Sequence, residues 1–164
     1  MPWKVVIDSD ALIKLTKSGL LPIITHAWQC LIPDEVYEEV VVRGKREAHP
    51  DAAEIERFIG RGLERGRVRA APRRISAVLG PGERAVVALF GKEQADLILT
   101  DDRAFLATLR QLGLPHPTPA LALVKLAEQG AMSLDQAQDY LDRLKPLIRS
   151  SVYEAARADL QKLI

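Results

Sequence analysis

The sequence predicts an α/β fold in which a short parallel sheet is covered by helices on both faces. Three runs of apolar residues, at 5–7, 30–32 and 97–100, have the length and continuity of strands buried on both sides. The stretches between them carry apolar residues at helical spacing. Because parallel strands need such crossovers, we expect three layers, α/β/α, around a short central sheet.

The chain has the size of one domain, 1–164. Of its 164 residues, 48% are hydrophobic, which is enough for a substantial core. We divide the domain into a core of about residues 1–118 and a helical C-terminal tail of residues 119–164. The net charge of +1 gives no bulk attraction to nucleic acid, so any such binding needs a local basic patch.

Two further observations bear on the compartment of the protein. Cys30 is the only cysteine, which excludes an internal disulfide and a cysteine-cluster zinc site and fits a reducing environment. No apolar run approaches the roughly 20 residues that a membrane-spanning helix needs. We therefore expect a soluble cytoplasmic protein without a membrane partner.

The first strand runs directly into polar residues, Asp8, Ser9 and Asp10. Either Ser9 or Asp10 is a suitable cap for the helix that follows, which Gly19 should end. A second helical piece at 21–28 leads to the strand at 30–32. A strand that ends in carboxylates is the first candidate for a functional edge.

The second strand is followed by a predicted helix with the sequence DEVYEEVVVRG, opened by Pro33. Its residues Glu38 and Glu39 are candidates for a further acidic contribution. The charged stretch 43–50 is expected to be a loop, and residues 51–64 a helix.

Positive charge is concentrated between residues 61 and 74. The sequence RGLERGRVRAAPRR holds six arginines and one glutamate, a local charge of +5. Arginine forms bidentate contacts with phosphate, so this segment is a candidate for nucleic-acid binding, and a solvated basic face is the structural alternative. The candidate contacts within it are Arg65, Arg67, Arg69, Arg73 and Arg74.

The stretch 80–105 contains a predicted helix and a strand that ends in two adjacent acids. Breakers at 80–82 precede a helix that should start near Glu83, where the helix dipole favours a carboxylate. The strand at 97–100 then ends in Asp101 and Asp102. Beyond it we expect a helix to Leu112, a short extended edge in LPHPTP, and three tail helices at 119–129, 133–147 and 151–164.

The acids that follow the strands should meet, because parallel strands end at one edge of the sheet. Several unpaired carboxylates in one crevice repel each other, and a divalent cation is the simplest compensation. A donor set made only of oxygen favours Mg²⁺ or Mn²⁺ over zinc, and two such ions suit the hydrolysis of a phosphodiester. For each acid taken singly, a helix cap or a solvated loop end is the structural alternative.

These motifs resemble those of the PIN-domain family, which includes VapC-like toxin ribonucleases, and the resemblance covers nearly the whole chain. The family's opening pattern is seen in Val-Val-Ile followed by Asp8 and Ser9. Its second acid falls best on Glu39, with Glu38 as the neighbouring choice, and its third on Glu83. The fourth, in a pattern like Thr-x-Asp-x-x-Phe, falls on Asp102.

The resemblance implies metal-dependent cleavage of single-stranded RNA, a homodimer, and a toxin role beside a cognate antitoxin protein. It implies catalytic roles for Asp8, Glu39, Glu83 and Asp102, metal ligation by Asp8, Glu83, Asp102 and Asp101, and accessory roles for Ser9, Asp10 and Glu38. Lys14, Arg84 and Arg103, close to the acids in sequence, are candidate phosphate contacts or surface ion pairs. The helical tail, and a glutamate at 83 where many VapC-like toxins carry aspartate, look more like a related PIN-like branch.

Two other functions are compatible with the residues. The pair Asp8 and Asp10 resembles the Asp-x-Asp of haloacid-dehalogenase-type phosphatases, although the threonine that usually follows is missing. A binding module with an inactive site, acting through RNA or a partner protein, is the other alternative. The apolar tail residues Leu141, Leu144, Leu147 and Ile148 either form a dimer interface or cover one face of the sheet.

Overall fold

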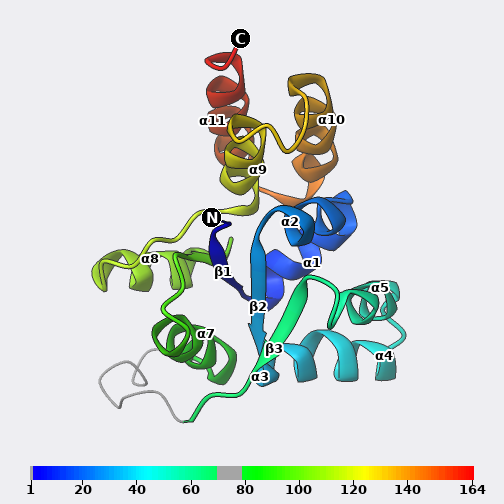
Figure 1. The fold of residues 1–164 in the computed structure, drawn as a ribbon, viewed down its shortest axis with the longest axis vertical. Helices are drawn as coiled ribbons and strands as arrows, with labels where there is room; N and C mark the ends of the chain where they lie inside the picture. Colours follow the sequence, from blue (N-terminus) through cyan, green and yellow to red (C-terminus); the bar gives the residue numbers. More distant parts are fainter. Residues whose placement is uncertain (1, 70–78) are drawn as a thin grey trace.

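The centre of the molecule is a four-stranded parallel sheet with the order β3-β2-β1-β4 (Figure 1). The computed structural model describes residues 2–69 and 79–164. The strands are β1 (Lys4–Ile7), β2 (Gln29–Pro33), β3 (Leu63–Gly66) and β4 (Leu97–Leu99). The α/β prediction is confirmed, including the three apolar runs that were predicted to be strands.

Helices cover both faces of the sheet because the direction of the strand order reverses. The chain moves outward from β1 through β2 to β3, then returns past β1 to β4, and right-handed crossovers place the two sets of helices on opposite faces. Figure 1 shows α1, α2 and α5 on one side and α7 on the other, where α7 packs against β1, β2 and β4. The elements are α1 (Ser9–Ser18), α2 (Leu21–Ala27), α3 (Asp34–Tyr37), the π-helix η1 (Glu38–Arg43), α4 (Gly44–Arg46), α5 (Pro50–Phe58), α7 (Pro81–Lys92) and α8 (Arg103–Gln111).

The central strand shows why the fold has three layers. Val5, Val6 and Ile7 are all fully buried. Since successive side chains of a strand point to opposite faces, burial of three in a row requires helices on both sides. Phe105 and Leu109 of α8 are fully buried as well and join the same core.

The segment from 38 to 66 differs from the prediction in two places. The helix does not stop at 43 but continues as η1 and α4 to Arg46, so most of the expected loop is helical. The predicted helix 51–64 ends at Phe58, because Gly60 and Gly62 adopt positive φ angles of +78° and +101°. A Cβ at Gly62 would lie 2.7 Å from the carbonyl oxygen of Thr25, so only glycine fits there, and the chain then enters β3.

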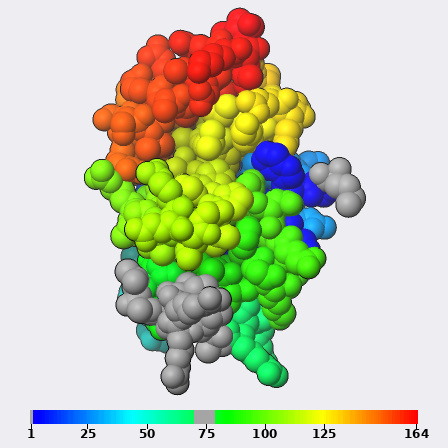
Figure 2. All heavy atoms as spheres, turned by 90° about the vertical axis from the view of Figure 1, so that its left-hand side faces the viewer, coloured from blue at the N-terminus to red at the C-terminus, as the bar shows by residue number. Residues whose placement is uncertain are grey.

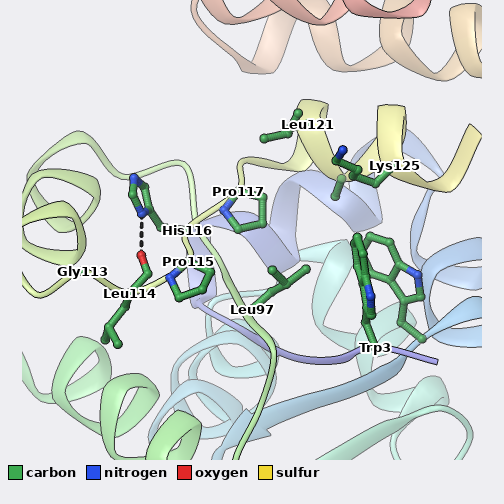
Figure 3. Close-up of a pocket in the computed structure, with 11 residues that line it drawn as sticks. Trp3, Leu97, Gly113, Leu114, Pro115, His116, Pro117, Leu121 and Lys125 are labelled. Carbon is green, nitrogen blue, oxygen red and sulfur yellow. Dashed lines mark hydrogen bonds between the residues drawn. The ribbon is translucent and has the colours of Figure 1, made fainter. Parts of the chain in front are cut away.

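The extended edge predicted in LPHPTP is confirmed, and it is joined to the sheet from one side only. The N–H groups of Ile98 and Thr100 donate to the carbonyl oxygens of Pro115 and Pro117 at 3.0 and 3.2 Å. Proline has no N–H to return these bonds. On the other side of the segment, His116 Nδ1 donates to the carbonyl oxygen of Leu114 at 2.7 Å (Figure 3).

The C-terminal tail forms its own group of helices above the sheet (Figure 1), and its residues make up one end of the molecule, coloured yellow to red in Figure 2. It consists of α9 (Pro119–Glu128), α10 (Leu134–Leu144), the short 3₁₀ helix η2 (Lys145–Leu147) and α11 (Ser150–Gln161). These helices pack against one another, and α9 and α10 also contact α1. Leu141 and Leu144 are fully buried inside the chain, so they give no support to a dimer, which stays a prediction. None of the described helices combines the length and apolarity needed to cross a bilayer.

Candidate functional site

A polar pocket of about 260 Å³ lies at the carboxyl edge of the sheet, beside the point where the strand order reverses between β1 and β4. It is lined by Asp8, Ser9, Asp10, Val36, Glu39, Gly80, Pro81, Gly82, Glu83 and Asp102. The four acids predicted as catalytic residues all line it, together with two of the predicted accessory residues. The structure thus brings together acids separated by up to 94 positions in the chain.

Asp8 is the most buried acid of the pocket. It follows β1 directly and caps α1, accepting a hydrogen bond from the N–H of Ala11 at 2.8 Å. The Thr100 hydroxyl donates to its other carboxylate oxygen. Burial raises the pKa of Asp8 from 3.8 to about 7, since the two hydrogen bonds only partly offset the loss of hydration and nearby Asp10 and Asp102 repel a second charge. Asp8 therefore keeps its proton to a higher pH than an ordinary aspartate does.

Asp102 lies across from Asp8 at the end of the neighbouring strand. Its side chain caps α8 by accepting from the N–H of Phe105 at 2.9 Å, and its own N–H donates to Thr100 Oγ1 at 3.2 Å. Thr100 is fully buried and thus contacts both acids. Thr100 therefore holds Asp8 and Asp102, the two acids predicted from strand ends, in place relative to each other. It belongs to the pattern Thr-x-Asp-x-x-Phe, but no role was predicted for it.

Glu39 enters the pocket from the π-helix η1. A π-helix adds a residue per turn relative to the α-helix and changes the direction in which its side chains point, and such turns are frequent at functional sites. The Ser9 hydroxyl donates to Glu39 Oε2 at 2.9 Å. A Cβ at Gly82 would lie 3.7 Å from the same oxygen, so the absence of a side chain at 82 keeps the space beside Glu39 open. Glu38 is exposed and does not line the pocket.

Glu83 caps a helix and also lines the pocket. It stands in the first turn of α7, where its Oε2 accepts from the N–H of Gly80 at 3.3 Å and so caps the helix. It also lines the pocket. Burial raises the pKa of Glu83, and the nearby charges of Asp102 and Glu39 add to this, while the bond from Gly80 acts against it. These neighbours show that the carboxylates share one electrostatic environment.

The donor set fits a hard divalent cation, because the pocket offers carboxylate oxygens and no sulfur or imidazole nitrogen. In the conformation described, each acid is turned to a local hydrogen-bond partner. Among residues 2–69 and 79–164, no three acidic, histidine or cysteine side chains converge closely enough to hold an ion. One carboxylate oxygen each of Glu39, Glu83 and Asp102 is used in these local bonds.

Asp101, the fourth predicted metal ligand, does not line the pocket. Its side chain is only 2% exposed and forms an ion pair with Lys14 Nζ at 2.7 Å. Lys14 also pairs with Asp10 at 3.0 Å, and Arg149 Nη2 lies 3.7 Å from the other oxygen of Asp101. Burial lowers the pKa of Lys14, but its hydrogen bonds to Asp101 and Asp10 outweigh this and the pKa is raised. For Lys14 the ion-pair alternative is therefore the one seen.

The other predicted phosphate contacts near the acids are placed differently. Arg84 is half-buried on α7, and Arg103 is exposed in the first turn of α8. Neither forms an ion pair with any residue in the described parts of the chain. Their contact with phosphate stays a prediction.

The basic segment contains residues with distinct environments. Arg65 lies in β3, pairs with Asp34 at 3.0 Å and stacks over the ring of Tyr37 at 3.7 Å. The side chain of Arg67 is 91% exposed, and Arg69 is exposed. Because β3 is parallel to β1, both leave the sheet at the edge where the acids lie. Arg73 and Arg74 lie outside the described residues.

A larger hollow of about 560 Å³ lies near the opposite, amino-terminal ends of the strands (Figure 3). Its walls are mostly apolar, with two indole rings, Trp3 and Trp28, 5.1 Å apart between centroids. It contains no carboxylate side chain, so the smaller polar pocket is the candidate site.

Sequence reasoning assigned no function to the Gly-Pro-Gly turn that forms one wall of the pocket, or to Arg149. The turn was noticed only as a helix breaker. Arg149 carried no signal, because its partner is 48 positions away.

A family model described as a PIN domain matches residues 4–159, which include both the sheet and the helical tail. No curated protein sequence matches the chain significantly. The matched family is generally one of nucleases, and its nuclease-like fold agrees with the three-layer architecture and with acids at the carboxyl edge of the sheet. Because the match spans nearly the entire sequence, the chain belongs to the PIN-domain family.

Proposed function

We propose that the protein is a divalent-metal-dependent ribonuclease that hydrolyses phosphodiester bonds of single-stranded RNA. The observation that carries the proposal is the meeting of Asp8, Glu39, Glu83 and Asp102 around one pocket at the switch point of the sheet. Each acid alone is explained by a helix cap or a surface position. The charge of Asp102 helps to raise the pKa of both Asp8 and Glu83, and such repulsion among clustered carboxylates is a cost that a bound cation would relieve.

Mg²⁺ or Mn²⁺ is the cation that this donor set favours, and Asp8, Glu39, Glu83 and Asp102 are the residues that would hold it. When bound, such an ion lowers the pKa of a water molecule and stabilises charge on a leaving phosphate oxygen. Thr100 fixes the orientation of Asp8 through its hydroxyl, and Ser9 does the same for Glu39. The local bonds thus keep the acids in place around the pocket.

The positive charge needed to hold an RNA backbone comes from Arg67 and Arg69, which leave β3 at the same edge of the sheet. Arg103, exposed at the start of α8 beside Asp102, adds a third candidate. RNA would then cross the pocket between the end of β3 and the start of α8. A single-stranded substrate fits best, because the pocket is small and its acids would repel the second strand of a duplex.

The test is cleavage of a labelled single-stranded RNA in the presence of Mn²⁺. We expect Asp8→Asn and Asp102→Asn to lower the rate at least a hundredfold, which corresponds to about 2.7 kcal/mol of transition-state stabilisation. Glu39→Gln and Glu38→Gln are a matched pair, because the two glutamates are adjacent and only Glu39 lines the pocket. Unchanged cleavage in both aspartate variants would refute the assignment.

A catalytically weak binding module is the second candidate. It is favoured by one observation, that the carboxylates of the described chain are each turned to local partners and do not converge on one point. Binding of RNA by the parent protein without cleavage at any Mg²⁺ or Mn²⁺ concentration would select it. Membership of the PIN-domain family argues against the phosphatase alternative.

We further propose that the protein acts as the toxin of a toxin-antitoxin pair. The support is the resemblance of the sequence motifs to those of VapC-like toxins, together with the match to a PIN-domain family model and the acidic pocket. Induced expression should then arrest growth of a bacterial host, and Asp8→Asn should relieve the arrest at equal protein level. Equal growth with parent and variant would remove the toxin role while leaving ribonuclease activity to be measured separately.

A further inference from the structure

Lys14 stands between two carboxylates beside the candidate pocket. Its Nζ lies 2.7 Å from Asp101 Oδ2 and 3.0 Å from Asp10 Oδ2, and only 17% of its side chain is exposed. Asp10 lines the pocket, whereas Asp101 is buried behind it. One ammonium group therefore binds an acid that faces the pocket and an acid that does not.

A second cation completes this arrangement from the tail. Arg149 precedes α11, and its Nη2 lies 3.7 Å from Asp101 Oδ1, a buried oxygen that has no hydrogen-bond partner in the described chain. Figure 1 shows the connection between α10 and α11 on the side of the tail that faces α1 and the sheet. Two acids and two cations thus form a neutral group that reaches from the wall of the acidic pocket, at Asp10, to the buried Asp101.

Charge neutrality matters at this place because six carboxylates are clustered there, five in the pocket and Asp101 behind it. Carboxylates at this density compete for any cation that enters. An ammonium group that is itself part of the fold occupies two of them permanently, and it leaves Asp8, Glu39, Glu83 and Asp102 for an external ion. The pair of Lys14 with Asp101 is largely shielded from water, since their side chains are 17% and 2% exposed, and this makes it stronger than a solvent-exposed pair.

We infer that Lys14 is a positioning residue of the pocket: it clamps Asp10 and Asp101 in an ion-pair group and so keeps both carboxylates from binding the divalent cation. The inference rests on the proposed function in one respect, that the pocket binds such an ion. It goes further by stating which of the clustered acids bind it, and it assigns Asp101 to the clamp and not to the metal. Lys14 thus limits the number of carboxylates that bind the divalent cation.

The sharpest variant is Lys14→Met combined with Asp101→Asn. Methionine keeps much of the length and the apolar stem of lysine, and the second change avoids leaving a buried aspartate without its closest partner. Because one positive and one negative charge are removed together, the net charge of the protein stays the same. What changes is that Asp10 is released from Lys14 and becomes available to the pocket.

Calorimetric titration of the metal-free protein with Mn²⁺, without RNA, is the measurement. We expect the double variant to bind Mn²⁺ roughly tenfold more tightly than the parent, the attraction expected between a divalent ion and one added carboxylate a few ångströms away in water. Adding Asp10→Asn should remove the gain. Lys14→Arg, which preserves the clamp, should bind like the parent, and thermal unfolding verifies that each variant is folded.

The outcomes separate this inference from the proposed function. If the parent binds Mn²⁺ and the folded double variant binds it equally or more weakly, the role of Lys14 is refuted while the metal-dependent function survives. If only the double variant binds Mn²⁺, the role of Lys14 is supported, and the proposal that the parent protein cleaves RNA with a metal ion is refuted. If neither binds, both are wrong.

Discussion

The hydroxyl of Thr100 donates a hydrogen bond to the carboxylate of Asp8 across the two neighbouring strands β4 and β1. Both residues are buried, and the bond acts against the burial that raises the pKa of Asp8. The link joins the two strand ends on either side of the switch point, so it ties the geometry of the pocket to the sheet itself. Its removal should therefore be measurable at the site.

We predict that Thr100→Val weakens Mn²⁺ binding at neutral pH. Valine has nearly the same shape but no hydroxyl, so the pKa of Asp8 should rise further and protons should compete more strongly with the ion. Thr100→Ser keeps the hydroxyl and is the matched control. Calorimetric titrations at several pH values should show the valine variant reaching its full affinity only at higher pH; identical curves for the valine and serine variants would contradict this.

The stability of the metal-free protein should fall as the pH rises through the range in which Asp8 titrates. Burial raises the pKa of Asp8 from 3.8 to about 7, so the folded chain holds this proton more tightly than the unfolded chain does. The stabilisation is complete below about pH 4 and is lost progressively as the pH rises to about 7, by on the order of 2–4 kcal/mol.

Asp8→Asn removes this titration while preserving a group that can accept from the N–H of Ala11. Denaturant unfolding of the parent and the variant between pH 4 and 8, in the presence of a chelator, is the measurement. We expect the variant to be the more stable of the two at pH 8 and its stability to depend less on pH. Parallel pH profiles for the two proteins would show that Asp8 has an ordinary pKa.

Substitutions at Glu83 should separate its capping role from its role in the pocket. Glu83→Gln can still accept from the N–H of Gly80 but has no charge, so its free energy of unfolding should stay within about 0.5 kcal/mol of the parent value. Glu83→Ala loses the cap as well and should be destabilised by about 1 kcal/mol. Both should bind Mn²⁺ at least tenfold more weakly. Normal metal affinity in Glu83→Gln would leave Glu83 as a cap only.

The arginines of the basic segment should fall into two classes. Arg67→Ala should weaken RNA binding and reduce the slope of log affinity against log salt by about 0.7, as expected for one lost contact to single-stranded phosphate. Arg65→Ala should instead lower the melting temperature, because Arg65 lies closer to Asp34 than Arg67 does, at 3.0 against 3.7 Å, and also stacks on Tyr37, an interaction worth about 0.5–1 kcal/mol. Filter binding at several salt concentrations and thermal unfolding test the two expectations, and a reversed pattern would contradict them.

The positions of Asp8 and Asp102 could be predicted from the sequence because each follows a short apolar run that has the length of a single buried strand. Parallel strands end at one edge, so the two acids had to lie together. Strand β3 could not be predicted in this way. Of its residues only Leu63 is buried, and the neighbouring arginines give it no strand pattern.

Side-chain contacts between residues far apart in the chain could not be predicted from the sequence. Lys14 was considered only for phosphate or a surface ion pair, and its partner Asp101 is 87 positions away. The choice of Asp102 over its neighbour Asp101 as the pocket residue followed from the family pattern. The structure gives a physical reason, since Asp101 is buried and points to Lys14 and Arg149. The π-helical winding around Glu39 has no recognisable sequence pattern.

The proline-rich segment beside β4 has a consequence for the behaviour of the protein at high concentration. The Leu114 carbonyl oxygen, on the outward side, accepts a hydrogen bond from the ring of His116. On the inward side, the carbonyl oxygens of Pro115 and Pro117 accept hydrogen bonds from β4 and the residue after it. An open strand edge is a template on which other chains add and form aggregates. Here one of the outward acceptors is already used by the chain itself, so a second copy that meets this border finds fewer free backbone groups to pair with.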